Sequence, residues 1–532
     1  MNDAGRAPTP GMVAPDRVFL FENHDQAYTI WRDRGVRDRI LVHVDAHHDM
    51  YGAWPAADGS RPQITIANYL YPAVEEGLVR EVIWVVPDRT LAGRAGRRWC
   101  AATTGRISPG ALPAAPAGGP GRKRRGASSA VLGRPLRCCT PVGLAGIEEP
   151  VLLDIDVDYM ILPDSRYLGI ECYGDRPWCW PDQLLERLAR AGLKTDLVTV
   201  ACSVMGGYTP LQWKYLGEEL TARIGGYAAP GLLAATDRMR RATLAVAQGD
   251  LGAAEAQVAE ARDLWPASAA PLFHLAHLNA ARGRIAAAQE FYQEALDRDP
   301  SYRTPFNSAG LWYFGNRRYG AAETAFKRIL TLDPHDPHAR CGLGLVAIRR
   351  RRWAEAELLF QEALAAAPDS VDAHRGLGRA LAEQGRNAEA IKAYERSLTL
   401  TLAGRQSLLD GMILTNPAED FLSDPMHGQV HARLGKLYAA NGDTSTAISA
   451  YRMGIALGEE TLAVRLRLAA LYLRRRQWGK AAGQLRPALR RLPAELARFV
   501  RKRRRRLLRQ LGAGWRAIAR RRAPEAAASL WC

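Results

Sequence analysis

A repeat of 34 residues in the C-terminal half constrains the fold of this chain more than any other feature of its sequence. Prolines recur at positions 266, 300, 334 and 368. Between them a small residue and an aromatic residue occupy fixed places, as Gly344 and Phe360 do in one copy. Small residues let two helices cross closely, the aromatic ring fills the space between them, and proline ends the unit because it cannot continue a helix. The repeat therefore predicts a stack of helix hairpins that cover one another's apolar faces.

This pattern resembles the tetratricopeptide repeat (TPR), whose known period is 34 residues. The resemblance covers about seven copies over residues 235–494. The stretch 402–424 breaks the register and is expected to be an inserted loop or a short extra helix. The resemblance implies an all-α TPR solenoid that binds a protein or peptide partner, which the sequence does not identify.

The N-terminal part has a different pattern, in which apolar strands alternate with helices. Strands are expected at 17–24, 39–49, 81–88, 150–159 and 196–203. Buried β-branched strands that alternate with helices predict a parallel α/β sheet, here in a domain over residues 16–230. Ligands bind such sheets at the carboxyl ends of the strands, and polar residues gather at these ends.

Two segments account for the net charge of +18, because residues 89–137 and 498–522 contain arginine and lysine but no acid. We expect residues 1–15 to be disordered. The segment at about 101–130, rich in Gly, Pro and Arg, is expected to be a disordered insertion, either a functional lid or an aberrant segment. The basic tail at 497–532 is interpreted as a solvated terminal helix. Nucleic acid or an anionic membrane is a less favoured partner for it.

Composition and cysteine usage exclude several classes of protein. Apolar residues make up 47% of the chain, enough to bury a core, so a wholly disordered protein is excluded. The eight cysteines form no CxxC pair and no regular framework. The sequence has no secretory signal pattern and no apolar run of the ~20 residues that a membrane helix needs. These features indicate a cytoplasmic protein with reduced thiols.

Acidic and imidazole side chains occupy alternate positions at two of the expected strand ends. VDAHHD places Asp45, His47 and Asp49 at every second residue, and LLDIDVD does the same with Asp154 and Asp156. In an extended backbone these side chains point to one side. Such crowding of carboxylates is costly without a counter-charge. One or two divalent cations would remove the cost, and oxygen with imidazole suits Mn, Zn or Fe, with Mn and Zn preferred here.

These motifs resemble those of the arginase/deacetylase superfamily. VDAHHD matches the ureohydrolase pattern Asp-Ala-His-x-Asp, LLDIDVD resembles the second acidic motif, and the resemblance spans about residues 16–225. It implies a metal-dependent hydrolase of a C–N (amide-type) bond. The metal ligands that it implies are His24, Asp45, His47, Asp49, Asp154 and Asp156. Asp158 is expected to be a helix cap or a group behind the ligands.

The end of the last expected strand departs from the arginase pattern. VACSVMGGYTP contains no acid where arginases place the Glu that grips the guanidinium, so arginine is not the expected substrate. GGYT instead resembles the Gly-Gly-Tyr of the deacetylase branch, which implies an oxyanion-stabilising role for Tyr208. A water made acidic by the metal would be the nucleophile. His48 or His43 would orient it or act as base, and the sequence does not choose between them.

The competing interpretation is a non-catalytic TPR scaffold that carries a degenerate arginase-like domain. Retention of the acidic residues in both motifs favours the enzyme. The missing Glu and the unusual segment at 101–130 favour the scaffold.

Overall fold

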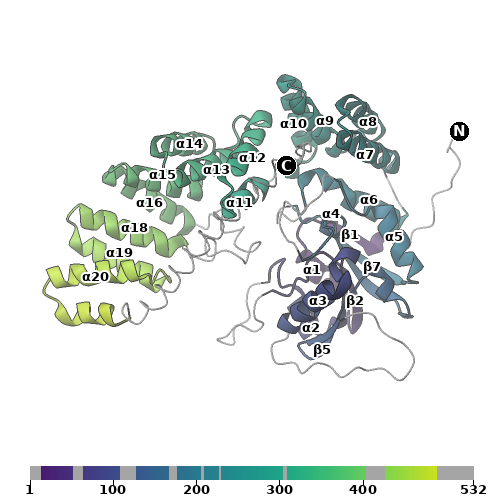
Figure 1. Ribbon diagram of the computed structural model, residues 1–532, viewed down its shortest axis with the longest axis horizontal. Coiled ribbons are helices and arrows are strands. Elements are labelled where there is room, and N and C mark those ends of the chain that lie inside the picture. Colours follow the sequence, from purple (N-terminus) through teal and green to yellow (C-terminus); the bar gives the residue numbers. More distant parts are fainter. Residues whose placement is uncertain are drawn as a thin grey trace. The chain divides into compact units, whose positions relative to one another are not determined.

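The computed structural model of the chain describes residues 13–51, 64–107, 127–166, 176–204, 209–226, 229–303, 308–402 and 426–487 (Figure 1). The chain forms two compact units. Among the described residues, unit 1 extends to Pro334 and unit 2 begins at His335. Several predictions lie outside the described residues: those for most of 1–15, for 403–424, for the basic tail and for Tyr208.

Unit 1 is built on a mixed sheet of seven strands in the order β1-β7-β6-β2-β3-β5-β4. The strands are β1 (Val18–Phe21), β2 (Arg39–Val44), β3 (Val79–Val85), β4 (Ala127–Val131), β5 (Arg134–Cys139), β6 (Val151–Asp156) and β7 (Thr195–Ala201). All neighbouring strands are parallel except β4 and β5. The prediction of a parallel sheet is therefore correct for the five predicted strands and wrong at one edge.

The antiparallel edge is a hairpin whose turn consists of Leu132 and Gly133. Both residues have positive φ, 47° and 77°, as a two-residue type I′ turn requires. Leucine is a rare choice at such a position, and for that reason the turn has no clear signal in the sequence. The predicted disordered insertion at 101–130 is also wrong at both ends. Helix α3 (Gly93–Ile107) runs into it, β4 begins at Ala127, and 108–126 lie outside the described residues.

Helices cover both faces of the sheet. In β2, Leu41 belongs to one apolar core, whereas its neighbours Val42 and Val44 belong to another. This alternation follows from the two-residue period of a strand, and burial on both faces is typical of parallel sheets. The helices of this part are α1 (Gln26–Asp33), α2 (Leu70–Glu75), α3, α4 (Asp158–Ile161), α5 (Pro181–Arg190) and α6 (Tyr215–Gly225).

Six further helices complete unit 1: α7 (Leu232–Ala247), α8 (Leu251–Leu264), α9 (Ala270–Ala281), α10 (Ile285–Arg298), α11 (Ser308–Gly315) and α12 (Tyr319–Leu332). Phe273 of α9 and Tyr292 of α10 belong to the same apolar core as Val44 of the sheet. His274 Nε2 lies 3.0 Å from the backbone oxygen of Gln212. The first helix hairpins thus pack into the α/β part. The predicted change of sequence pattern between residues 230 and 235 is not a boundary between compact units.

Unit 2 consists of further helix hairpins (Figure 1). Its helices are α13 (Pro337–Arg349), α14 (Trp353–Ala366), α15 (Val371–Glu383), α16 (Asn387–Leu402), α18 (Met426–Ala440), α19 (Thr444–Ala456) and α20 (Leu462–Arg474). Phe360 is fully buried, and its ring packs closely against two glycines. A Cβ added at Gly344 or Gly376 would lie only 2.7 or 2.2 Å from the ring. This is the close crossing that the repeat predicted. None of the helices in the described ranges combines the length and apolar character needed to cross a bilayer.

Candidate metal centre

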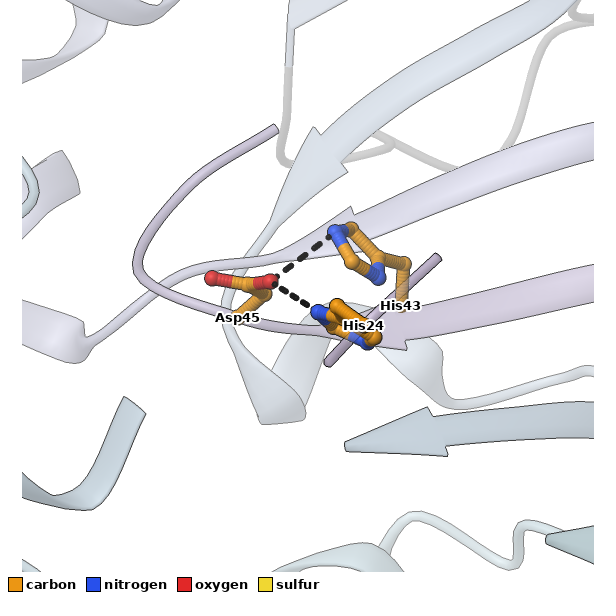
Figure 2. A group of neighbouring side chains, drawn as sticks. All are labelled: His24, His43 and Asp45. Carbon is orange, nitrogen blue, oxygen red and sulfur yellow. Dashed lines mark ion pairs between the residues drawn. The ribbon is translucent and has the colours of Figure 1, made fainter. Parts of the chain in front are cut away.

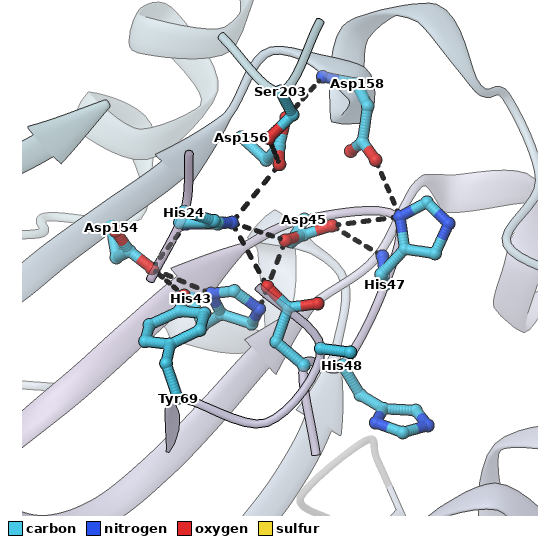
Figure 3. Close-up of polar contacts among 12 residues, drawn as sticks. His24, His43, Asp45, His47, His48, Tyr69, Asp154, Asp156, Asp158 and Ser203 are labelled. Atoms are coloured by element: carbon cyan, nitrogen blue, oxygen red, sulfur yellow. Dashed lines mark hydrogen bonds and ion pairs between the residues drawn. The ribbon is translucent and has the colours of Figure 1, made fainter. Parts of the chain in front are cut away.

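The candidate site lies at the carboxyl ends of three strands. His24 follows β1, Asp45 follows β2 directly, and Asp156 is the last residue of β6. Strands β2 and β6 are neighbours in the sheet, with His43 paired in register with Asp154. Parallel strands end at the same edge, so side chains from distant parts of the sequence meet there. Polar contacts connect all three strand ends (Figure 3).

One group of possible ligands consists of His24, His43 and Asp45 (Figure 2). Asp45 Oδ2 lies 3.2 Å from His24 Nδ1 and 3.3 Å from His43 Nε2. All three side chains are buried, and these three atoms have no hydrogen-bond partner within the described part of the chain. Buried polar atoms without a hydrogen bond are costly. Their convergence on one point is the arrangement expected around a cation.

A second group consists of Asp45, His47 and Asp158. His47 Nδ1 lies 2.6 Å from Asp158 Oδ2 and 3.5 Å from Asp45 Oδ1. Asp158 begins α4, but its carboxylate also accepts a bond from the backbone nitrogen of Ala46, 3.2 Å away. Asp158 therefore begins a helix, as expected, and its carboxylate also fixes the loop that contains VDAHHD. Asp45 is common to both groups and contributes one oxygen to each.

Asp49 and Asp156 complete the carboxylates around His24. His24 Nδ1 lies 3.1 Å from Asp49 Oδ2 and 3.2 Å from Asp156 Oδ2. Asp156 Oδ2 also accepts a hydrogen bond of 2.5 Å from Ser203 Oγ. Asp49 and Ser203 both have positive φ, 47° and 53°. Such backbone conformations are uncommon outside glycine and concentrate at functional sites.

Asp154, also a predicted ligand, lies deeper in the strand and has a different environment. Its Oδ2 lies 2.9 Å from His24 Nε2 and 3.0 Å from His43 Nδ1, and accepts a hydrogen bond of 2.8 Å from Tyr69. Its Oδ1 accepts a 2.6 Å hydrogen bond from Thr199. Both oxygens are therefore occupied by protein groups.

His48 lies apart from these contacts. Its ring stacks on Tyr51 at 4.0 Å and meets the edge of Trp84 at 5.5 Å, and Nδ1 accepts a bond from the backbone nitrogen of Met50. Figure 3 shows it directed away from the cluster. Burial, with the charge of His47, lowers the pKa of His48 to about 3. The structure thus brings the predicted metal ligands together but leaves His48 outside.

Burial and crowding shift the protonation of the cluster. Burial alone would lower the pKa of His24, but the charge of Asp154, its hydrogen bond with His24, and the nearby carboxylates of Asp156 and Asp45 outweigh burial and raise the pKa well above 6.5. Burial and the charge of Asp45 raise the pKa of Asp49 to about 6. Without a cation, the cluster therefore retains protons that a bound metal would displace.

Several members of the site have no clear signal in the sequence. From the sequence, His43 is only an alternative to His48, although it stands two residues before Asp45 and the same alternation reaches it. Tyr69 comes from the residue before α2 and has no motif around it. Thr199 lies inside β7, where a polar residue in an apolar strand was the available signal.

The residues present fit a divalent transition metal. In each of the two groups, the three possible ligand atoms lie within 4.8 Å of one another, and every residue is buried. Imidazole nitrogen and carboxylate oxygen together suit Mn, Zn or Fe. The orphaned atoms of the first group give this fit its strongest support.

Comparison with known proteins identifies the helical part. The family model described as "Tetratricopeptide repeat" matches residues 239–303, 309–371 and 341–401, so the C-terminal region contains TPR repeats. The match includes none of the residues that resemble the arginase/deacetylase superfamily, and that resemblance stays a prediction. No curated protein matches this chain.

Several solved structures resemble parts of the chain. MamA is 18% identical, with a TM-score of 0.28, and the match covers 35% of this chain and 95% of MamA. A tetratricopeptide repeat protein from Parabacteroides merdae is 18% identical, with a TM-score of 0.25, and covers 48% of this chain and 92% of its own. YrrB, described as a TPR protein with an unusual peptide-binding site, is 20% identical, with a TM-score of 0.25, and covers 39% and 95%.

Proposed function

We propose that unit 1 is a metal-dependent hydrolase of a C–N (amide-type) bond and that the TPR repeats bring a protein or peptide partner to it. The convergence of His24 Nδ1, His43 Nε2 and Asp45 Oδ2, buried and without hydrogen bonds among the described residues, carries this proposal. A protein rarely leaves three such atoms facing one another unless something binds between them.

The residues at the strand ends receive roles according to their positions. Six residues would hold one or two divalent ions, Mn or Zn: His24, Asp45, His47, Asp49, Asp156 and Asp158. When bound, such an ion polarises a carbonyl and lowers the pKa of water. Ser203 fixes Asp156 through its 2.5 Å hydrogen bond. Tyr208 keeps its proposed role in stabilising an oxyanion, from a position outside the described residues.

Metal content tests the proposal directly. Full-length protein purified without chelator should contain about one or two divalent ions per chain, measured by inductively coupled plasma mass spectrometry. Asp45→Asn should reduce this content to background, because both groups lose a shared anionic ligand. Asp33→Asn removes an exposed carboxylate at the end of α1 and should leave the content unchanged. Wild-type protein without metal would eliminate the hydrolase proposal.

Activity is tested on the metal-loaded chain with acylated amines and short acylated peptides. Release of the free amine should require added Mn or Zn and should be absent in Asp45→Asn. A loaded wild-type chain that cleaves none of these amide-type substrates would contradict the proposed reaction while leaving metal binding intact.

One observation favours the alternative, a TPR scaffold with a degenerate domain. His24 Nε2 lies 2.9 Å from Asp154 Oδ2, and the nearby carboxylates raise the pKa of His24, so an imidazolium there would balance part of the negative charge without a cation. In that case the protein would contain no metal, and partner binding through the repeats would be unaffected by Asp45→Asn.

The cellular compartment is also part of the proposal. Six described cysteines are free and buried: Cys100, Cys138, Cys139, Cys179, Cys202 and Cys341. Burial in apolar surroundings raises the pKa of Cys139 to about 12, so this thiol is a poor nucleophile. Unpaired thiols suit a reducing compartment, and we propose the cytoplasm.

A further inference from the structure

His43 belongs to the converging group of three atoms but is not among the six proposed ligands. It lies within β2, is fully buried, and belongs to neither acidic motif. Its Nδ1 lies 3.0 Å from Asp154 Oδ2, while its Nε2 faces Asp45 Oδ2 at 3.3 Å without a hydrogen bond in the described part of the chain. A fully buried imidazole with one nitrogen fixed and the other unsatisfied needs an explanation.

Asp154 explains the orientation of the ring. Its Oδ2 is within 3.0 Å of three protein groups, from His24, His43 and Tyr69. A carboxylate oxygen offers about two lone-pair sites. Oδ2 is therefore saturated, and Oδ1 is occupied by Thr199. The oxygen of Asp154 that contacts both histidines therefore has no lone pair left for a metal, while Oδ1 accepts one bond, from Thr199.

The contacts of Asp154 also set the tautomers of two histidines. A carboxylate only accepts hydrogen bonds, so the protons of the neutral rings belong on His24 Nε2 and His43 Nδ1. The opposite nitrogens, His24 Nδ1 and His43 Nε2, then carry lone pairs, and both face Asp45 Oδ2. This is the carboxylate–histidine arrangement that prepares imidazoles to bind metals.

We propose that His24, His43 and Asp45 form a site of two imidazoles and one carboxylate for a single transition-metal ion, with Asp154 as the residue that positions both rings. This inference rests on the proposed metal centre and deepens it. Nitrogen-rich ligation favours Zn, Fe or Co over Mg or Mn. His43 would thereby make the centre selective for the softer ions.

Metal titrations of the full-length chain test this assignment. Wild-type protein stripped of metal with a chelator should bind Co(II) and give the intense visible absorption that is typical of Co(II) with a low coordination number. It should also bind Zn much more tightly than Mn. His43→Gln should lose at least tenfold in Zn affinity and most of the preference over Mn. Asp154→Asn should weaken Zn binding by about 10- to 100-fold, the usual effect of removing a residue that orients a ligand. His374→Gln, in α15 of unit 2, is the matched control and should change neither quantity.

The outcomes separate this inference from the proposed function. If the wild-type chain binds no metal, both fall. If it binds metal but His43→Gln and Asp154→Asn leave affinity, selectivity and the Co(II) spectrum unchanged, the centre stands and the role of His43 is wrong.

X-ray absorption of wild-type protein loaded with one zinc per chain needs no variant. Two imidazoles in the zinc shell support the assignment, and a single imidazole overturns it even if the variants do not fold.

Discussion

The strand ends of unit 1 and the helix crossings of unit 2 both bury side chains completely, but they bury opposite kinds. In unit 2, Phe360 packs against Gly344 and Gly376 with no polar atom at the contact. In unit 1, the buried side chains at the sheet edge are carboxylates and imidazoles, with Asp45 and Asp154 fully inaccessible. Apolar packing stabilises a fold, whereas buried charge costs stability unless it is compensated. A protein that keeps the second kind retains it for binding or chemistry.

Chelation should distinguish the two regions most strongly. If a cation occupies the cluster around Asp45, removing it with a chelator should destabilise unit 1 by about 4 kcal/mol for an ion present at about 1,000 times its Kd. Unit 2 should not respond, because its helices contain none of the proposed ligands. Hydrogen exchange would locate the change, with faster exchange in β2 and β6 and no change in α13–α16. Equal increases in hydrogen exchange in both units would contradict the prediction that the cation stabilises unit 1 alone.

Lowering the pH should destabilise unit 1 through His274, a buried polar group of another type. It lies at the contact between the α/β part and the first helix hairpins. Burial, partly offset by a hydrogen bond to the backbone of Gln212, lowers the pKa of His274 from 6.5 to about 4. Because the pKa of His274 is lower in the folded state, the unfolded chain binds the proton at a higher pH than the folded chain does. The free energy of unfolding is therefore unaffected by this group above about pH 6.5 and falls as the pH is lowered toward 4. The loss should be about 3 kcal/mol.

This pH effect is measured as the free energy of unfolding of unit 1 between pH 7 and pH 4. His274→Gln removes the titrating group, so its unfolding free energy should fall less over this range than that of the wild-type chain. Parallel curves for the two proteins would show that His274 does not titrate as inferred.

The glycine contacts of the repeats should give the smallest effect. Gly376→Ala places a methyl group against the ring of Phe360, where the Cβ would lie 2.2 Å away, and should destabilise unit 2 by about 1–3 kcal/mol. Gly479→Ala is the matched control, because it has open space around its Cβ and should be neutral or slightly stabilising. Thermal unfolding measures both, and metal content should stay constant. An equal response at the two positions would contradict the packing argument.

The two regions also differed in how far the sequence could predict them. Each repeat is a local unit, so spacing alone located the crossing of Gly344 with Phe360. Alternation was expected to bring Asp45, His47 and Asp49 to one side of an extended strand, but β2 ends at Val44 and these residues lie on the loop that follows, where Asp49 has a φ of 47°. Sequence alone could not show how far β6 extends before it reaches the site. Asp154 and Asp158 lie on one motif, yet the structure binds the first to histidines inside the sheet and the second to His47 at the edge.

Other contributions had no local pattern to find. Tyr69 reaches Asp154 from the residue before α2, and only the three-dimensional arrangement joins them. From the sequence, His43 is an ordinary residue inside a strand. Its pairing with Asp154 of β6 is a property of the sheet and cannot be found in either strand alone.

The apolar core that α9 and α10 share with the sheet has a practical consequence for anyone dividing this protein into expression fragments. A fragment that ends near residue 230 would lack Phe273 and Tyr292, which belong to that core. It would therefore expose an apolar surface that promotes aggregation. The α/β part and the first helix hairpins are therefore not separable modules. A graft of the N-terminal portion onto another scaffold must carry its first helical hairpins, through Pro334, with it.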